Sequence, residues 1–225
     1  MKSNKKAERL VGLLFLIIFA TGITVYQFLQ GPLFSDNFLT LTSAHATEII
    51  ISTLLLFLSS ITSIVIAIIL LPIFKKHSIT LAFLYLAFSI LGFVAIAIDN
   101  VSVLSLLELS LEYTKNGSDS SDTLNALGNV FYKKHWWTHY LSLLMSCFPV
   151  FILYYTLLVS KLVPKIFSIV GIIAAVLMFI EILFSIFGHS ISMNMMLPIG
   201  LIQLIFPLWL IFKGLNSPTL GTEIK

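Results

Sequence analysis

The sequence predicts an all-α membrane protein, a polytopic bundle of six transmembrane helices with both termini in the cytoplasm. Three observations support this class. The mean hydropathy is +1.04, and 10% of the 225 residues are charged, whereas soluble domains carry about 25%. Six apolar runs each approach the roughly 20 residues that a membrane-spanning helix needs. The cations gather where the chain would face one side of the membrane. We therefore expect one integral membrane domain over residues 1–225.

The six runs also predict where each helix begins and ends. The spans are expected at residues 10–30, 47–74, 78–100, 136–160, 165–188 and 195–213. Helices are favoured over barrel strands because strands that cross a membrane are about half as long. Residues 31–47 and 114–134 are expected to form outer loops. Residues 101–113 alternate Leu with Ser and Glu, so they either prolong the third helix beyond the bilayer or lie on its surface as an amphipathic helix.

The cations predict the orientation of the bundle. Loops rich in Lys and Arg stay in the cytoplasm, and an even number of spans returns both termini to one side. The net charge of +3 is spread along one membrane edge, so the expected partner is the lipid bilayer and not a nucleic acid. The inner cations flank the spans as Lys2, Lys5, Lys6, Arg9, Lys75, Lys76, Lys161, Lys165, Lys213 and Lys225, against Lys115, Lys133 and Lys134 outside.

Polar side chains inside the spans predict a site. Transmembrane helices pack through small and polar residues, and the strongly polar side chains lie on such faces. We predict an outward-facing polar pocket, and helix geometry places Glu181 and Gln203 at a similar depth in the last hairpin, as neighbours. The pocket residues are Glu48, Asp99, His139, Glu181 and Gln203.

Three functions are compatible with this pocket, because an ionisable side chain in a span is costly unless it is paired or used. The leading hypothesis is binding of a small amphipathic ligand or lipid. The second is a proton-coupled carrier that uses Glu181. The third is a metal-dependent intramembrane hydrolase, since His135 and His139 have the i,i+4 spacing of metal ligands. That spacing is a weak signal, so we expect no bound metal and no cofactor, and the sequence names no catalytic residue.

Each polar residue also has a purely structural interpretation. Glu181 can be a neutral carboxyl group that is hydrogen-bonded to Gln203 and joins two helices. His139 can be a hydrogen-bonded histidine between helices. Asp99 and Glu48 can be solvated helix ends, and Glu48 is favoured near a helix N-terminus by the helix dipole. The sequence leaves these interpretations open beside the functional ones, and it leaves the oligomeric state open.

Several short runs resemble a known family. They are LLVSKLVPKI at residues 157–166, GII at 171–173, LP at 197–198, WLIFKG at 209–214 and RLVGLLF at 9–15. In this order and spacing they are similar to a bacterial membrane family catalogued as a domain of unknown function, forty-three eighty-six. The resemblance implies a multi-pass protein of six to seven helices in the bacterial cytoplasmic membrane and implies no activity. It also implies a Glu in many relatives where this chain has Gln203.

Overall fold

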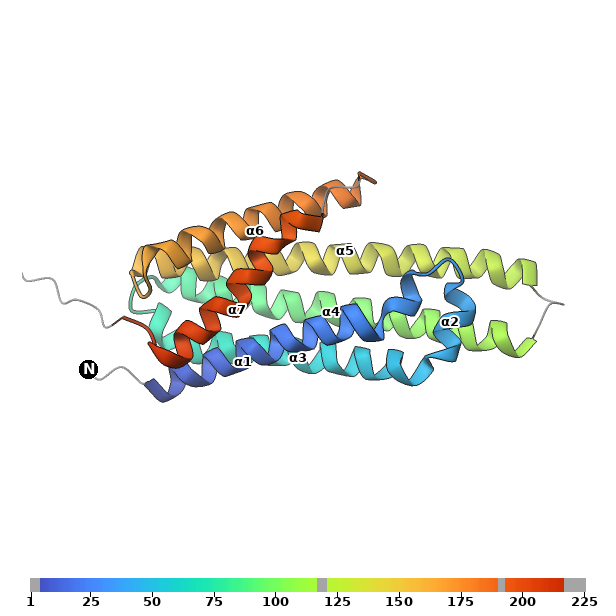
Figure 1. The fold of residues 1–225 in the computed structure, drawn as a ribbon, viewed down its shortest axis with the longest axis horizontal. Coiled ribbons are helices and arrows are strands. Elements are labelled where there is room, and N and C mark those ends of the chain that lie inside the picture. Colours follow the sequence, from blue (N-terminus) through green and yellow to red (C-terminus); the bar gives the residue numbers. More distant parts are fainter. Residues whose placement is uncertain (1–4, 117–120, 190–192, 217–225) are drawn as a thin grey trace, which may run out of the picture.

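A bundle of long helices forms the whole described part of the chain (Figure 1). The computed structural model describes residues 5–116, 121–189 and 193–216, and within these ranges it contains no strand. The helices are α1 (Lys5–Thr24), α2 (Phe38–Ala44), α3 (Ala46–Phe74), α4 (Ile79–Asn116), α5 (Ser121–Ser160), α6 (Lys165–Ile186) and α7 (Leu197–Phe212).

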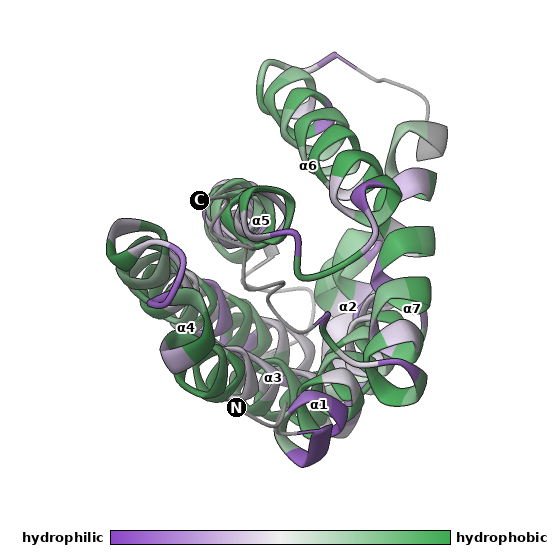
Figure 2. Cartoon of the chain, turned by 90° about the vertical axis from the view of Figure 1, so that its left-hand side faces the viewer, coloured by the Kyte–Doolittle hydropathy of each residue, from purple (hydrophilic) through white to green (hydrophobic). Residues whose placement is uncertain are grey.

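The lengths of the helices confirm the membrane bundle. Five stretches are long and apolar enough to cross a bilayer: Lys5–Leu29, Ala46–Phe74, Ile79–Lys115, Asp122–Ser160 and Lys165–Ile186. The sixth predicted span corresponds to α7, which is apolar but shorter, with 16 residues. Hydrophobic residues make up most of each helix of the bundle (Figure 2), and many of their large side chains are exposed. Lipid is the solvent that such a surface requires.

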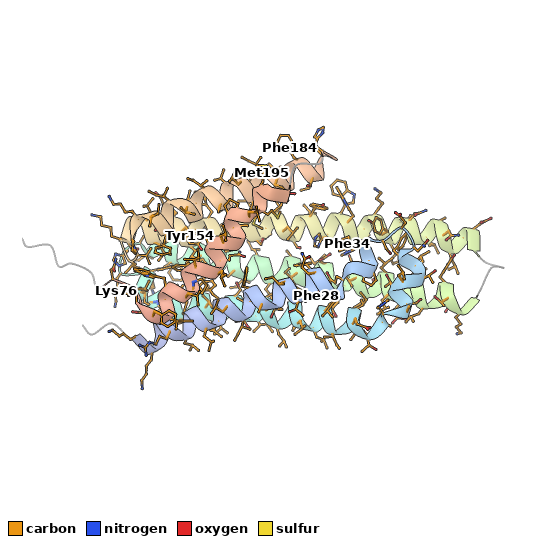
Figure 3. The ribbon with its side chains drawn as sticks, viewed as in Figure 1. Phe28, Phe34, Lys76, Tyr154, Phe184 and Met195 are labelled. Atoms are coloured by element: carbon orange, nitrogen blue, oxygen red, sulfur yellow. The ribbon has the colours of Figure 1, made fainter. Side chains whose placement is uncertain are left out.

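The two ends of the bundle differ. The beginning of α1 and the end of α7 lie together at one end, which we call the basal end, and Lys76 lies there as well (Figures 1 and 3). The opposite, distal end holds α2 and the tips of α4 and α5. All eight cations that the structure describes at the basal end come from the predicted inner side, and Glu8 is the only carboxylate described there.

The α4–α5 hairpin corrects the predicted outer loop at residues 114–134. Helix α4 runs unbroken to Asn116, and α5 begins at Ser121, well before the predicted start of its span at residue 136. These helices have 38 and 40 residues, or about 57 and 60 Å at 1.5 Å per residue, against a hydrocarbon core of about 30 Å. Residues 101–113 therefore prolong the third span, and the hairpin extends beyond the bilayer.

Packing against α2 explains why the hairpin stays helical outside the membrane. Residues 31–47, expected as a loop, contain a 3₁₀ turn, η2 (Gly31–Phe34), and α2. The Ser110 hydroxyl donates to the Leu39 carbonyl, and Ser43 Oγ lies 2.7 Å from Thr114 Oγ1. A Cβ on Gly128 would collide with Leu39, so α2 also approaches α5 closely. Neither loop prediction could include these contacts between distant segments.

Two hydrophobic clusters fill the interior. The larger one lies toward the basal end, where Phe74, Tyr85, Leu157 and Phe206 are buried together. A smaller one near the distal end contains Leu33, Ile49, Val103, Leu106 and Leu107. Residues 98–102 of α4 belong to neither cluster. The interior between the two clusters is polar, and this interval positions the candidate site.

Candidate polar site

Asp99 is the centre of a buried polar cluster between α4 and α5. Its side chain is 1% exposed. His135 Nδ1 lies 3.1 Å from Asp99 Oδ1, and the Thr138 hydroxyl donates to the same oxygen at 2.7 Å. His139 Nδ1 lies 3.5 Å from Asp99 Oδ2, within ion-pair range but without hydrogen-bond geometry. A carboxylate with two donors and a second imidazole beside it is compensated for its burial.

A second group of contacts joins this cluster to α3 and to the end of α1. Asn100 Nδ2 donates to the Thr53 carbonyl at 2.9 Å. Gln30 Nε2 donates to Ser52 Oγ at 3.1 Å, and Ser52 in turn donates to the Ile49 carbonyl. Because Ser52 and Thr53 are adjacent on α3, and Asp99 and Asn100 on α4, these contacts lie at one level of the bundle.

Aromatic side chains from the end of α1 and from η2 pack against the two histidines. Helix α1 ends in a π-helical turn, η1 (Val25–Leu29), followed by η2. The Tyr26 ring meets the His139 ring edge-on at 5.5 Å, and the Phe34 ring lies 5.6 Å from both imidazoles. Phe34 is 45% exposed, so it covers the histidines from the outside. We call Gln30, Ser52, Asp99, Asn100, His135, Thr138 and His139 the polar belt.

Helix geometry places the belt near the distal membrane boundary. At about 1.5 Å per residue, Asp99 lies about 30 Å along α4 from Ile79, and His139 lies about 31 Å along α5 from Ser160. Both distances match the hydrocarbon thickness of about 30 Å. Trp136 and Trp137 stand beside the belt on α5, at the depth where Trp side chains favour the lipid–water interface.

The belt contains buried polar atoms that have no hydrogen-bond partner. The Asn100 amide nitrogen donates to the Thr53 carbonyl. The Gln30 amide nitrogen donates to the Ser52 hydroxyl, which itself donates to the Ile49 carbonyl. The oxygens of both amides have no hydrogen-bond partner, and two imidazole nitrogens have none either. Buried polar groups are nearly always paired with protein or water, so this group is unusual. The unpartnered atoms are Gln30 Oε1, Asn100 Oδ1, His135 Nε2 and His139 Nδ1.

The structure brings together some of the predicted pocket residues and separates others. Asp99 and His139 lie side by side. Glu48 is half-buried in the first turn of α3, and no hydrogen bond or ion pair joins it to another described residue. Glu181 lies on α6, and α5 stands between α4 and α6 (Figure 2). That Glu48, Glu181 and Gln203 share one pocket with Asp99 stays a prediction.

The structure contains no hydrogen bond between Glu181 and Gln203, which was the structural interpretation of Glu181. Glu181 Oε1 accepts from the Ser185 hydroxyl at 3.2 Å, one turn along the same helix. Glu181 Oε2 is buried and has no partner. Gln203 is half-buried on α7. Similar depth in a hairpin does not guarantee a bond, because the rotation of each helix about its axis also has to bring the two side chains together.

The two histidines face a carboxylate with their Nδ1 atoms. In metal sites a histidine commonly binds the ion through one ring nitrogen while the other bonds to a carboxylate. Here both Nδ1 atoms approach Asp99. Across residues 5–116, 121–189 and 193–216 no three His, Cys, Asp or Glu side chains are arranged to hold a metal ion. The i,i+4 spacing of His135 and His139 serves the contact with Asp99.

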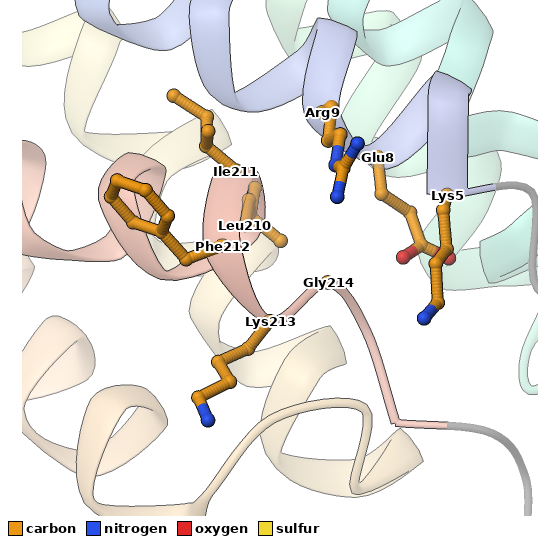
Figure 4. Close-up of a pocket in the computed structure, with 8 residues that line it drawn as sticks. All are labelled: Lys5, Glu8, Arg9, Leu210, Ile211, Phe212, Lys213 and Gly214. Carbon is orange, nitrogen blue, oxygen red and sulfur yellow. The ribbon is translucent and has the colours of Figure 1, made fainter.

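Two surface hollows lie at opposite ends of the bundle and away from the belt. The distal one, with a volume of about 230 Å³, is lined by residues of α2, of the segment before it and of the hairpin tip, including Asp36, Tyr113, Asn125 and Asn129. The basal one is a shallow hollow of about 20 Å³ between the beginning of α1 and the end of α7 (Figure 4). Neither hollow is lined by a residue of the predicted pocket.

Comparison with known proteins assigns the chain to a family. Residues 10–214 match the family described as Domain of unknown function (DUF4386). The chain belongs to this family. Searches of curated proteins and of solved structures found no match. The match confirms the resemblance that the short runs of sequence predicted, and the family description assigns no activity. The matched residues include every residue of the polar belt.

Belt members that the sequence did not reveal include Gln30, Asn100 and Thr138. A signal existed for two of them. Gln30 precedes Gly31 and Pro32, where the helix must end, and Asn100 is adjacent to Asp99. Thr138 carried no signal, because a threonine in a span usually bonds to its own helix. His135 was considered only as a metal ligand near the membrane edge, yet its side chain is fully buried.

Proposed function

We propose that this multi-pass membrane protein binds the polar group of a small amphipathic ligand or lipid at the polar belt. The observation that supports the proposal is the set of four buried polar atoms without a hydrogen bond on Gln30, Asn100, His135 and His139, of which His139 Nδ1 also approaches Asp99 at 3.5 Å. A buried amide oxygen without a partner costs about 1–3 kcal/mol. A ligand that satisfies several of these atoms at once would recover that cost as binding energy.

The chemistry of the unpartnered atoms defines the ligand class. Two are amide oxygens, which accept hydrogen bonds, and the imidazole nitrogens can accept or donate according to tautomer. The belt therefore suits a group with hydroxyl or amine donors. Its depth suits an amphipathic molecule, because a polar group held near the distal boundary leaves an apolar tail in the hydrocarbon.

We propose a location in a bacterial cytoplasmic membrane, as the family resemblance implies, and the charges of the two ends support its orientation there. The described residues of the basal end carry eight cations and one carboxylate, whereas the distal end carries three cations and five carboxylates. By the positive-inside rule the basal end faces the cytoplasm. The belt then belongs to the outer half of the membrane, and we infer that the ligand enters from the outer leaflet or from outside.

Native mass spectrometry of the purified full chain tests the proposal. The wild type in a mild detergent should retain small molecules or lipids from the host membrane. Asn100→Leu removes one free acceptor and should lose them at least about tenfold, which corresponds to roughly 1.4 kcal/mol. Ser185→Ala, which lies on α6 outside the belt, should retain them. An empty wild type, or equal retention by Asn100→Leu, would contradict the proposal.

A proton-coupled carrier is the second candidate, and it is favoured by the buried, unpartnered Oε2 of Glu181. Such an oxygen is available to exchange a proton. Proteoliposomes that enclose a pH-sensitive dye would measure proton movement driven by the ligand found above. If Glu181→Gln moved protons as fast as the wild type, Glu181 would not be the coupling group, and binding alone would remain as the function.

A further inference from the structure

We propose that the basal hollow between α1 and α7 is a binding site for the phosphodiester headgroup of an anionic phospholipid from the inner leaflet. The charges around the hollow and its position beside exposed apolar side chains support this inference. It does not depend on the polar belt, which lies at the other boundary of the membrane, about 30 Å away along the bundle.

Three cations surround the hollow and have no partner of their own. Lys5 and Arg9 lie on α1, and Lys213 follows α7 on the other side of Gly214 (Figure 4). All three side chains are exposed, and none is engaged in an ion pair within the described residues. Three like charges around one hollow repel each other, and an anion placed between them would relieve that repulsion.

The single carboxylate in the hollow is already committed to the fold. Glu8 is 5% exposed, and its Oε2 accepts a hydrogen bond from the Leu215 backbone N–H at 2.9 Å. Gly214 has φ +77° and lies against this carboxylate so closely that a Cβ would collide with it. Glu8 therefore anchors the chain after α7 to α1, and it neutralises only one of the three positive charges.

Further contacts hold this segment in place. The Asn216 N–H donates to the Leu162 carbonyl at 2.7 Å, and its side-chain amide donates to the Lys161 carbonyl at 3.2 Å. Residues 213–216 thus connect the beginning of α1 with the turn between α5 and α6. The backbone that carries Lys213 is therefore fixed relative to α1, which carries Lys5 and Arg9, and this lowers part of the entropy cost of gathering the three cations around one anion.

The apolar surroundings indicate a lipid rather than free phosphate. Phe212 also lines the hollow and is 76% exposed, and Leu10, the residue after Arg9, is 46% exposed. These side chains face the hydrocarbon just beside the cations. A phospholipid can place its phosphate among the cations and its acyl chains against Phe212 and Leu10. Basic pockets between helices on the cytoplasmic side recognise lipid headgroups in this way.

A lipid titration tests the site. The full chain in neutral detergent is titrated with phosphatidylglycerol or with phosphatidylcholine, and bound lipids are counted by native mass spectrometry. We expect saturable binding of phosphatidylglycerol only. Arg9→Gln with Lys213→Gln should weaken it about tenfold or more, since each cation near a membrane surface contributes about 1 kcal/mol. Lys75→Gln with Lys76→Gln removes the same charge at the same end outside the hollow, and it should change binding by less than about twofold.

Three outcomes would overturn the proposal. Equal weakening by both double variants would mean a diffuse attraction of the basal end for anions. Equal binding of the two lipids would mean that the cations play no part. Displacement of phosphatidylglycerol by millimolar inorganic phosphate would mean a site for the free ion. If the double variant does not fold, Lys5→Gln alone serves the same comparison, with an expected loss of about fivefold, the equivalent of about 1 kcal/mol.

Discussion

Asp99 and Glu181 are both acidic residues inside a membrane bundle, and their surroundings give them opposite roles. Asp99 accepts a hydrogen bond from the Thr138 hydroxyl and faces two imidazoles. Glu181 has one hydroxyl partner and one buried oxygen without any. Asp99 therefore organises its neighbours, whereas Glu181 carries an uncompensated burial cost. Substitutions at the two positions should change stability in opposite directions.

Asp99→Ala should lower the free energy of unfolding by about 3–5 kcal/mol, because it leaves the buried His135 Nδ1 without its acceptor and removes one of the two acceptors of the Thr138 hydroxyl. Unfolding of the purified protein by a denaturing detergent, followed by circular dichroism, measures this change. Ser105→Ala is the matched control on α4, since the Ser105 hydroxyl is exposed and bonds to its own helix. It should stay within about 0.5 kcal/mol of the wild type. Similar small effects at both positions would mean that the belt is not a stability element.

Glu181→Gln should leave stability unchanged or raise it by about 1 kcal/mol. The amide oxygen can still accept from Ser185, while the substitution removes a carboxylate whose second oxygen is buried without a partner. The same unfolding measurement applies. A loss of more than about 2 kcal/mol would show that Glu181 has a stabilising partner, and it would weaken the case for Glu181 as a free proton site.

Close helix crossings depend on single glycines. Gly171 on α6 lies against the ring of Tyr154 on α5, so closely that a Cβ would overlap the ring. Tyr154 is itself buried in the larger hydrophobic cluster. Small residues at such crossings let helices approach in lipid, where no hydrophobic force drives them together. Helix α6 packs small residues inward over its first half, where Ser168, Gly171, Ala174 and Ala175 are buried.

Gly171→Ala should destabilise the α5–α6 pair by about 1–3 kcal/mol, because the aromatic ring is wedged between two helices and cannot move without displacing its neighbours. Gly92→Ala on α4 is the matched control, because a Cβ there would meet nothing within 4 Å. In a helix interior that change should be neutral or stabilise by up to about 1 kcal/mol. Thermal unfolding of both variants in one detergent gives the comparison. Equal effects would contradict the close crossing.

The bundle as a whole is an asymmetric object. Its basal end is basic, its distal end is acidic, and the α4–α5 hairpin extends beyond the other helices at the distal end (Figure 1). The sole cysteine, Cys147, is buried. Single cysteines introduced at the two ends should therefore report orientation without interference from the native thiol, and Cys147→Ser provides a silent background.

Asn125→Cys, near the hairpin tip, should react with a membrane-impermeant maleimide in intact cells. Lys76→Cys, at the basal end, should react only after the membrane is permeabilised. Both positions are exposed, so accessibility from one side or the other is the only variable. Mass tagging on a gel measures the labelled fraction. The reverse pattern would place the basal end outside, and the phospholipid site would then face the outer leaflet.

Hydrophobic runs and the distribution of lysines were enough to establish the class, the helix order and the shared end of the two termini. Lipid imposes these features on any chain, because a spanning segment must be apolar, about 20 residues long and internally hydrogen-bonded. This argument did not predict where α4 ends and α5 begins, because it applies only inside the hydrocarbon. Outside the hydrocarbon their helicity depends on packing against α2. Contacts such as that between Ser110 and Leu39 join residues far apart in the chain, so a local stretch of sequence does not predict them.

The polar site was likewise predicted only in part from the sequence. Asp99 and His139 could be singled out from the sequence, because a charged or polar residue in an apolar run is conspicuous and costly. Their common partnership with His135, and the links through Asn100 and Gln30 to α3, depend on how far each helix is rotated and displaced along its axis. A rotation of one residue, about 100°, turns a partner away. Only the packed bundle specifies those rotations, which is why it joins Asp99 to two histidines and forms no hydrogen bond between Glu181 and Gln203.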